Sequence, residues 1–173
     1  VVLDALGAQR ADPIARAGHQ VSILVNNAGA AKSARLAATD DALWTEMLGV
    51  NLSGTFHCMR AALPALLEAK AGRIVNVAST AGVVGYPYVA AYCAAKHGVV
   101  GLTRALALEL ASTAVTVNAV CPGSTATALL GVLASDVSGL GGNSQEVGTT
   151  THGAGSAPGY VLWDPSDVVP FRR

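Results

Sequence analysis

The chain has 173 residues, 51% of them hydrophobic and 13% charged, with a formal net charge of zero at pH 7. This composition is typical of a folded domain, and it excludes the basic surface that binding to nucleic acid or an anionic membrane requires. No apolar run could span a bilayer and no basic leader precedes the first residues, so we expect a cytoplasmic protein. The three cysteines (Cys58, Cys93 and Cys121) and four scattered histidines lack metal-ligand spacing, which predicts buried thiols and no metal site.

Strand and helix patterns alternate through the middle of the chain. Short apolar runs predict strands, and longer stretches with helical spacing predict helices. The elements expected are strands over residues 21–27, 73–78 and 115–120, and helices over residues 39–70 and 88–112. Bends are expected in the first helix at Gly49, Gly54 and Pro64. The alternation predicts an α/β fold with a parallel sheet.

The two ends of the chain differ from this middle. Residues 1–3 could form a strand, and Asp12-Pro13 is typical of a helix start, but the chain begins as if partway through a domain. Residues 134–160 are rich in Gly, Ser and Thr, which predicts a loop or disorder, and residues 160–163 could form a short strand or an anchor. We therefore expect a catalytic domain over residues 1–130 and an atypical segment over residues 131–173.

Tyr92 and Lys96 are four residues apart, so they share one face of the predicted helix. A free tyrosine is a poor acid or base at neutral pH, whereas a nearby ammonium group stabilises the phenolate and lowers the pKa. The pair is therefore a candidate acid/base device. On its own the spacing is a weak signal, because many exposed helices carry Tyr and Lys in this arrangement.

Polar residues also follow the predicted strands, where α/β sheets bind ligands. Ser79 comes directly after the second strand and could hold a substrate carbonyl oxygen, or could simply cap a helix. Asn26-Asn27-Ala28-Gly29 and Pro122-Gly123 follow the other two strands, and each could be a plain turn. Asn51 lies in an apolar helical region and could be a satisfied core amide at a bend.

Together these features resemble the short-chain dehydrogenase/reductase family over roughly residues 21–130. The matching motifs, in family order and spacing, are Asn26-Asn27-Ala28-Gly29, Asn51-Leu52-Ser53-Gly54-Thr55-Phe56, Ile74-Val75-Asn76-Val77-Ala78-Ser79, Tyr92-x-x-x-Lys96, and Asn118-Ala119-Val120-Cys121-Pro122-Gly123 with Thr127. From Ala78 to Gly123 the amino-acid sequence looks most like those of 3-oxoacyl-thioester and polyketide ketoreductases. The resemblance implies a Rossmann-like parallel sheet with helices on both faces. It also implies an oxidoreductase that moves a hydride between NAD or NADP and a carbonyl or secondary alcohol.

The resemblance further implies a role for each matching residue. Tyr92 would exchange a proton with the substrate oxygen, Lys96 would lower the pKa of Tyr92 and bind the nicotinamide ribose, and Ser79 would orient the substrate. Asn51 would bend its helix and hold a water that relays protons to Lys96. The residues expected to line the cofactor site are Asn26, Ala28 and Gly29 at the ribose, and Pro122, Gly123, Thr125 and Thr127 at the nicotinamide.

Two regions depart from the family pattern. No strand with a Gly-rich turn precedes Asn26, so the first βαβ portion, which holds the cofactor pyrophosphate, is expected to be lacking. Residues 131–173 do not resemble the family's ending. The alternatives are therefore a truncated, inactive member or partner subunit, and a relative that catalyses dehydration or epimerisation.

Small residues along the helix over residues 92–110 imply an assembly. In the family this helix and the one over residues 51–67 pack against a second copy, so the resemblance implies a homodimer or homotetramer. Close packing within one subunit would explain the same small residues.

Overall fold

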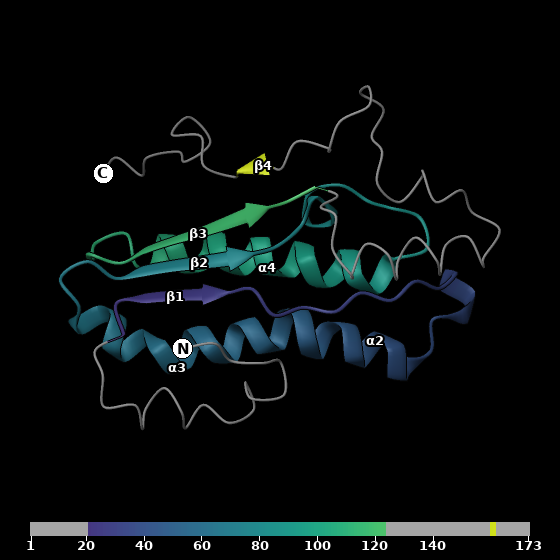
Figure 1. The fold of residues 1–173 in the computed structure, drawn as a ribbon, viewed down its shortest axis with the longest axis horizontal. Helices are drawn as coiled ribbons and strands as arrows, with labels where there is room; N and C mark the ends of the chain where they lie inside the picture. The colour runs from purple at the N-terminus through teal and green to yellow at the C-terminus, as the bar shows by residue number, and fades with distance from the viewer. Residues whose placement is uncertain (1–20, 124–159, 162–173) are drawn as a thin grey trace.

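The computed structural model describes residues 21–123 and 160–161 (Figure 1). The strands are β1 (Ile23–Asn26), β2 (Arg73–Val77), β3 (Thr116–Cys121) and β4 (Tyr160–Val161). The helices are α2 (Asp41–Leu48), α3 (Gly54–Glu68) and α4 (Ala90–Glu109), with the short turns η2 (Leu36–Ala38) and η4 (Thr80–Gly82) and the π-helical η3 (Gly49–Ser53). Predictions for residues 1–20, and the expected cofactor residues Thr125 and Thr127, lie outside the described residues.

The described strands form one sheet in the order β1-β2-β3-β4. The first three strands are parallel, as the alternation of patterns predicted. The short strand β4 pairs antiparallel with β3, so the strand considered for residues 160–163 is present over its first two residues. Because β1, β2 and β3 run in the same direction, their carboxyl ends meet at one edge of the sheet.

The main hydrophobic core lies between the sheet and the two long helices α3 and α4. Leu24, Ile74 and Val117 are aligned across β1, β2 and β3, and all three are buried. They pack with Leu66 from α3 and with Leu106 from α4. Both long helices therefore lie on the same face of the sheet. On the opposite face Ile23 is 61% exposed, within the described part of the chain.

The first predicted helix is divided by a π-helical turn. Asp40 caps α2 by accepting a hydrogen bond from the Leu43 amide at 2.8 Å. The π-helical turn η3 then separates α2 from α3 in the region where Gly49 and Gly54 predicted bends. Pro64, the third expected bend, lies inside the continuous helix α3. Such π-helical turns are rare and often mark functional sites.

The helix α4 begins two residues later than the pattern predicted. Tyr88 has a φ of 65°, in the left-handed region, so it cannot belong to a right-handed helix. The helix therefore starts at Ala90 and ends at Glu109. None of the helices described is both long enough and apolar enough to cross a membrane.

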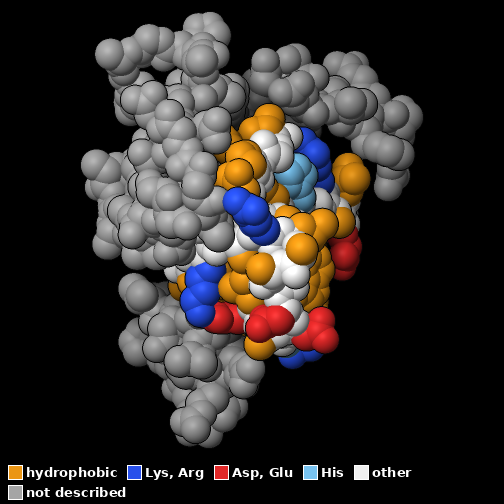
Figure 2. All heavy atoms as spheres, turned by 90° about the vertical axis from the view of Figure 1, so that its right-hand side faces the viewer, with side chains coloured by type: hydrophobic (Ala, Val, Ile, Leu, Met, Phe, Trp, Pro, Cys, Tyr) orange, Lys and Arg blue, Asp and Glu red, His pale blue; other side chains and the backbone are white. Residues whose placement is uncertain are grey.

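The end of the molecule where α2 begins carries a mixed surface. Figure 2 shows apolar side chains there beside acidic and basic ones. Leu36 of η2 and Trp44 of α2 are among the exposed apolar residues. Lys32 and Glu46 form an ion pair at 2.6 Å, which ties the loop after β1 to α2. Because both side chains are well exposed, this pair contributes little to stability.

Candidate active site

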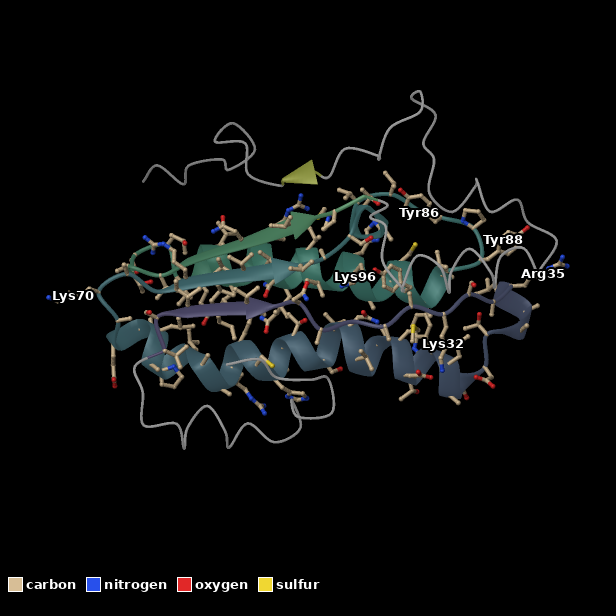
Figure 3. The ribbon with its side chains drawn as sticks, viewed as in Figure 1. Lys32, Arg35, Lys70, Tyr86, Tyr88 and Lys96 are labelled. Carbon is tan, nitrogen blue, oxygen red and sulfur yellow. The ribbon has the colours of Figure 1, made fainter. Side chains whose placement is uncertain are left out.

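The carboxyl ends of β1 and β2 bring together three of the expected catalytic residues. Lys96 enters from α4, and its Nζ donates to the Val77 carbonyl oxygen at 2.9 Å. The same Nζ lies 5.7 Å from the centre of the Tyr92 ring. The side chain of Ser79, just after β2, forms a hydrogen bond with Tyr92. Figure 3 shows Lys96 beyond the tips of these strands, with Tyr86 and Tyr88 on the adjoining loop.

Ser79 has the capping role considered for it, and its role toward a substrate oxygen remains a prediction. It is the residue before η4, and its Oγ accepts a hydrogen bond from the Ala81 amide at 3.1 Å. The cap fixes the side chain, which also bonds to Tyr92. A capping serine that is already held in one orientation can present its hydroxyl to a substrate oxygen at little cost in conformational entropy.

Burial is the largest cause of the pKa shifts of both Tyr92 and Lys96. Burial raises the pKa of Tyr92 above its usual value, and the hydrogen bond with Ser79 offsets part of this rise. Burial also lowers the pKa of Lys96 to about 8. Desolvation of the ring therefore sets the net direction in this structure, and the lowering of the Tyr92 pKa by Lys96 remains a prediction. In this state Tyr92 is a neutral phenol, the form that donates a proton.

Asn51 is the central residue of η3 and is fully buried. Its Nδ2 donates to the carbonyl oxygens of Ala30 and Met47, both at 2.9 Å. Its Oδ1 accepts from the Ala30 amide at 3.2 Å, and its own carbonyl accepts from Thr55 Oγ1. The side chain therefore holds the loop after β1 against the π-helical turn, as a satisfied core amide does. It bends the helix as expected, and its proton-relay role remains a prediction.

Gly29 lies where this loop passes close to Asn51 and Lys96. A Cβ added at Gly29 would lie 2.9 Å from Asn51 Oδ1 and 3.6 Å from Lys96 Nζ. The first distance is shorter than real Cβ contacts allow, so only glycine fits without a shift. The loop after β1 therefore lies against Asn51 and Lys96, which places Gly29 beside the proposed proton-transfer groups.

The remaining cofactor candidates lie on the loops after β1 and β3. Asn26 donates from Nδ2 to Asn76 Oδ1 at 2.7 Å, so its amide is held at the end of β1. Ala28 is exposed on the same loop. The Pro122 carbonyl accepts from the Thr80 amide at 2.9 Å, which joins the loop after β3 to η4, and Gly123 follows directly. These loops border the same edge of the sheet as Lys96.

Sequence reasoning gave no role to two buried polar residues behind this edge. Asn76 is fully buried, and its Nδ2 donates to Thr103 Oγ1 at 2.9 Å. Asn76 was part of a family motif, and an amide inside an apolar strand is a signal of a specific partner. Thr103 carried no local signal, because it lies 27 residues further along the chain.

The cysteines and acidic residues offer no metal ligands in the described ranges. No group of three or more His, Cys, Asp or Glu side chains there could hold a metal ion. The three cysteines are free and buried, each in a separate apolar cluster. Their prediction as buried thiols is confirmed.

The motifs that follow β1, β2 and β3 in the sequence therefore lie at one edge of the sheet. A sequence profile of the family described as "short chain dehydrogenase" matches residues 8–138. The chain belongs to the short-chain dehydrogenase family. The match covers all of the residues that the resemblance drew on, together with residues 8–20, for which no motif was recognised.

Relatives in this family are similar to the chain over part of their length. A 3-oxoacyl-[acyl-carrier-protein] reductase of Synechocystis is 45% identical over 108 residues, covering 62% of the chain and 44% of the relative. A carveol dehydrogenase from Mycobacterium avium, solved with NAD, has a TM-score of 0.67 and 33% identity, covering 74% of the chain and 48% of the dehydrogenase. An actinorhodin polyketide ketoreductase, solved with NADPH, has a TM-score of 0.70 and 41% identity, covering 79% and 54%. The chain thus spans about half of each relative. The Rossmann-like fold and the likeness to ketoreductases are confirmed.

The family binds NAD or NADP, and the residues at the strand ends fit the nicotinamide and ribose part of either cofactor. Of the three N–H groups on Lys96, one donates to Val77, so two remain for the hydroxyl groups of a ribose. Tyr92 and Ser79 stand beside them with hydroxyl groups of their own. The described residues therefore supply the hydrogen-bonding groups that this end of the cofactor requires.

Proposed function

We propose that this chain carries the proton-transfer centre of an NAD(P)-dependent reductase or dehydrogenase that interconverts a carbonyl and a secondary alcohol. The observation that carries the proposal is the convergence of Ser79, Tyr92 and Lys96 at the carboxyl ends of β1 and β2. The cofactor, when bound, supplies or accepts the hydride. The chain's own residues position the substrate oxygen and move the proton.

In the direction of reduction, Ser79 donates a hydrogen bond to the substrate carbonyl oxygen and holds it near Tyr92. The raised pKa of Tyr92 keeps the phenol protonated at neutral pH, so its O–H donates a proton to that oxygen as the alcohol forms. The Lys96 ammonium, 5.7 Å from the ring centre, stabilises the negative charge left on the phenolate. Proton return to Tyr92 completes the cycle. Oxidation follows the same steps in reverse.

The proposed substrate class is a 3-oxoacyl thioester or a related ketone. Support comes from the amino-acid sequence between Ala78 and Gly123 and from the likeness to a 3-oxoacyl reductase and a polyketide ketoreductase. Both relatives act on carbonyl groups, according to their names. The loop from Thr80 to Val89 borders Tyr92 and would contact the rest of the substrate, since Ala81, Val89 and the Tyr86 ring pack around Tyr92.

The proposal is tested by binding and turnover together. NADH and NADPH are each titrated into the purified protein, and reduction of acetoacetyl-CoA is followed by loss of nicotinamide absorbance. We expect saturable binding of one cofactor, and turnover that falls by a factor of about 10² or more in Tyr92→Phe, with cofactor affinity retained. Tyr88→Phe, on the adjoining loop, is the matched control: it removes the same hydroxyl group and should lose far less of the rate than Tyr92→Phe does. An absence of cofactor binding at millimolar concentration would contradict the proposal.

We also propose that the protein assembles as a homodimer or homotetramer through the outer faces of α3 and α4. Phe56 and Leu67 on α3 are 40% and 47% exposed, and Leu108 on α4 is 62% exposed. Three large apolar side chains left open on the two long helices favour burial against another surface. The Arg60 guanidinium lies 5.1 Å from the Phe56 ring centre and shields one side of it.

A further inference from the structure

A polar layer separates two apolar layers on the helix-facing side of β2. Ile74 packs in the main core, and Ala78 packs in a second cluster with Val99 and Val100. Asn76 lies between them on the same face and is 0% exposed. An amide buried in this position costs stability unless its donors and acceptor are satisfied. The hydrogen-bond partners of Asn76 therefore show which elements the buried amide holds together.

The partners of Asn76 form a chain of hydrogen bonds that crosses from β1 to α4. Asn26 Nδ2 donates to Asn76 Oδ1 at 2.7 Å, and Asn76 Nδ2 donates to Thr103 Oγ1 at 2.9 Å. Thr103 Oγ1 in turn donates to the Val99 carbonyl oxygen at 2.7 Å. Asn76 Nδ2 also lies 3.4 Å from Met59 Sδ. All of these donors point in one direction, so each hydrogen bond polarises and strengthens the next.

The chain ends on the face of α4 that carries the proposed acid/base pair. Four of the buried residues of this helix, Tyr92, Lys96, Val99 and Thr103, lie on that face. Their spacing of four, three and four residues places them in one stripe along the helix. Lys96 donates to the carbonyl of Val77, and Thr103 accepts from the side chain of Asn76. The helix is therefore held to two consecutive residues of β2, at points two turns apart.

We propose that Asn76 and Thr103 are positioning residues that hold Tyr92 and Lys96 in place relative to the carboxyl ends of β1 and β2. The inference rests on the proposed function where it concerns turnover. Apolar packing holds α4 against the sheet, and the two hydrogen-bonded attachments at Lys96 and Thr103 fix its position relative to β2. Through Asn26 the same chain fixes the start of the loop that includes Gly29. The side-chain amide of Asn76 thus fixes both the start of this loop and the face of α4 that carries Tyr92 and Lys96.

The test compares Thr103→Val, which keeps the side-chain shape and removes the hydroxyl, with Thr103→Ser, which keeps the hydroxyl. The readout is the titration of Lys96 by NMR of lysine labelled with ¹³C at Cε, in a chain that has three lysines, Lys32, Lys70 and Lys96. Substitution of Lys32 or Lys70 by Arg assigns the other two signals. This measurement does not require turnover, so it distinguishes failure of the positioning role from failure of the proposed function.

In Thr103→Val we expect the Lys96 midpoint to rise from about 8 toward its usual value, because a helix that moves away from β2 admits water to the ammonium group. The titratable groups that face Lys96 in the described structure are Tyr92 on its own helix and Cys121 at the end of β3. Neither is altered by the substitution. Thr103→Ser should titrate as the wild type does. If the wild type turns over, kcat should fall about tenfold or more in the valine variant.

A fall in melting temperature with the Lys96 midpoint and kcat both unchanged would reduce Thr103 to a purely structural role and overturn the proposal. The double variant Asn76→Leu/Thr103→Val should shift Lys96 no further than Asn76→Leu alone, since both break one chain. Strictly additive shifts of the Lys96 midpoint would contradict a single chain of hydrogen bonds through Asn76 and Thr103. If these variants do not fold, a measurement of amide exchange on the wild type still tests the proposal. The side-chain amide protons of Asn76 should exchange with solvent far more slowly than those of exposed Asn27, and equal rates would overturn the proposal.

Discussion

Asn51 and Ala30 exchange two hydrogen bonds across the junction between the loop after β1 and the π-helical turn η3. The Ala30 amide donates to Asn51 Oδ1 at 3.2 Å, and Asn51 Nδ2 donates back to the Ala30 carbonyl at 2.9 Å. The pairing imitates the contact between two strands, with one amide side chain in place of a peptide group. One side chain thus sets the distance between the cofactor loop and the helices that follow it.

Asn51→Asp tests this pairing with the smallest change of shape. In the native chain Nδ2 faces the carbonyl oxygens of Ala30 and Met47, so a carboxylate oxygen in its place would be repelled by both. We expect a loss of about 3 kcal/mol or more in the free energy of unfolding at pH 7. The burial raises the aspartate pKa in the folded state, so the loss should shrink as pH falls through that pKa. Urea unfolding at pH 5 and pH 7 measures it, and a pH-independent loss would contradict this account.

Gly29→Ala should disturb the site even though Gly29 is exposed. The new methyl group would meet Asn51 Oδ1 at 2.9 Å, and Asn51 cannot turn away without breaking its bonds to Ala30. We expect a loss of about 1–3 kcal/mol in stability and weaker cofactor binding. Gly85→Ala is the matched control, because an added Cβ at that position meets nothing within 4 Å. Equal stability of the two variants would show that the loop after β1 adjusts freely.

Lys96→Met should change the pH dependence of stability. In the folded chain the pKa of Lys96 is lowered to about 8 from 10.5, so the unfolded chain binds this proton more tightly between those values. The stability of the wild type relative to the variant should therefore rise as pH increases from 8 to 10.5, by at most about 3 kcal/mol. Below pH 8 the cost of burying the charge is fully present. Denaturant unfolding of both proteins across this range checks the sign, and a falling difference would refute it.

Phe56→Glu should dissociate the proposed assembly without unfolding the subunit. Phe56 is 40% exposed on α3, so a charge there would be hydrated in a single subunit and buried in the oligomer. We expect a smaller mass by size-exclusion chromatography with light scattering, and an unfolding free energy at low protein concentration within about 0.5 kcal/mol of the wild type. Trp44→Glu, at similar exposure on α2, should leave the mass unchanged. A wild type that is already monomeric would exclude the interface.

Local patterns predicted the strands and helices because the periodicity is local. Each expected element in residues 21–123 is present, with ends that differ by a few residues. The late start of α4 was not predictable, since the left-handed φ of Tyr88 depends on its loop, in which the Tyr88 carbonyl accepts from the Ala34 amide. Of the bends expected at Gly49, Gly54 and Pro64, the π-helical turn η3 begins at the first and ends beside the second, whereas Pro64 lies inside the continuous helix α3.

The candidate site was predictable where motif residues come together, as Ser79, Tyr92 and Lys96 do at the carboxyl ends of β1 and β2. The direction of the Tyr92 pKa was not, because it depends on how deeply Ala31, Ala81 and other side chains bury the ring. The attachment of Asn76 to Thr103 was missed for a similar reason. It joins residues on separate elements, and no pattern within either element indicates the other.

The π-helical turn η3 has a consequence for how the chain tolerates insertions and deletions. A π-helical turn contains about one residue more than an α-helical turn, so removing a single residue between Gly49 and Ser53 would restore a continuous helix. Because this turn winds more widely than an α-helical one, its additional residue leaves the faces of the helices on either side nearly in phase. The deletion would therefore leave Met47 and Leu66, both fully buried, facing the core. The same deletion inside α3 would rotate the rest of that helix by about 100°, so an in-frame loss of one codon should be tolerated better at η3 than there.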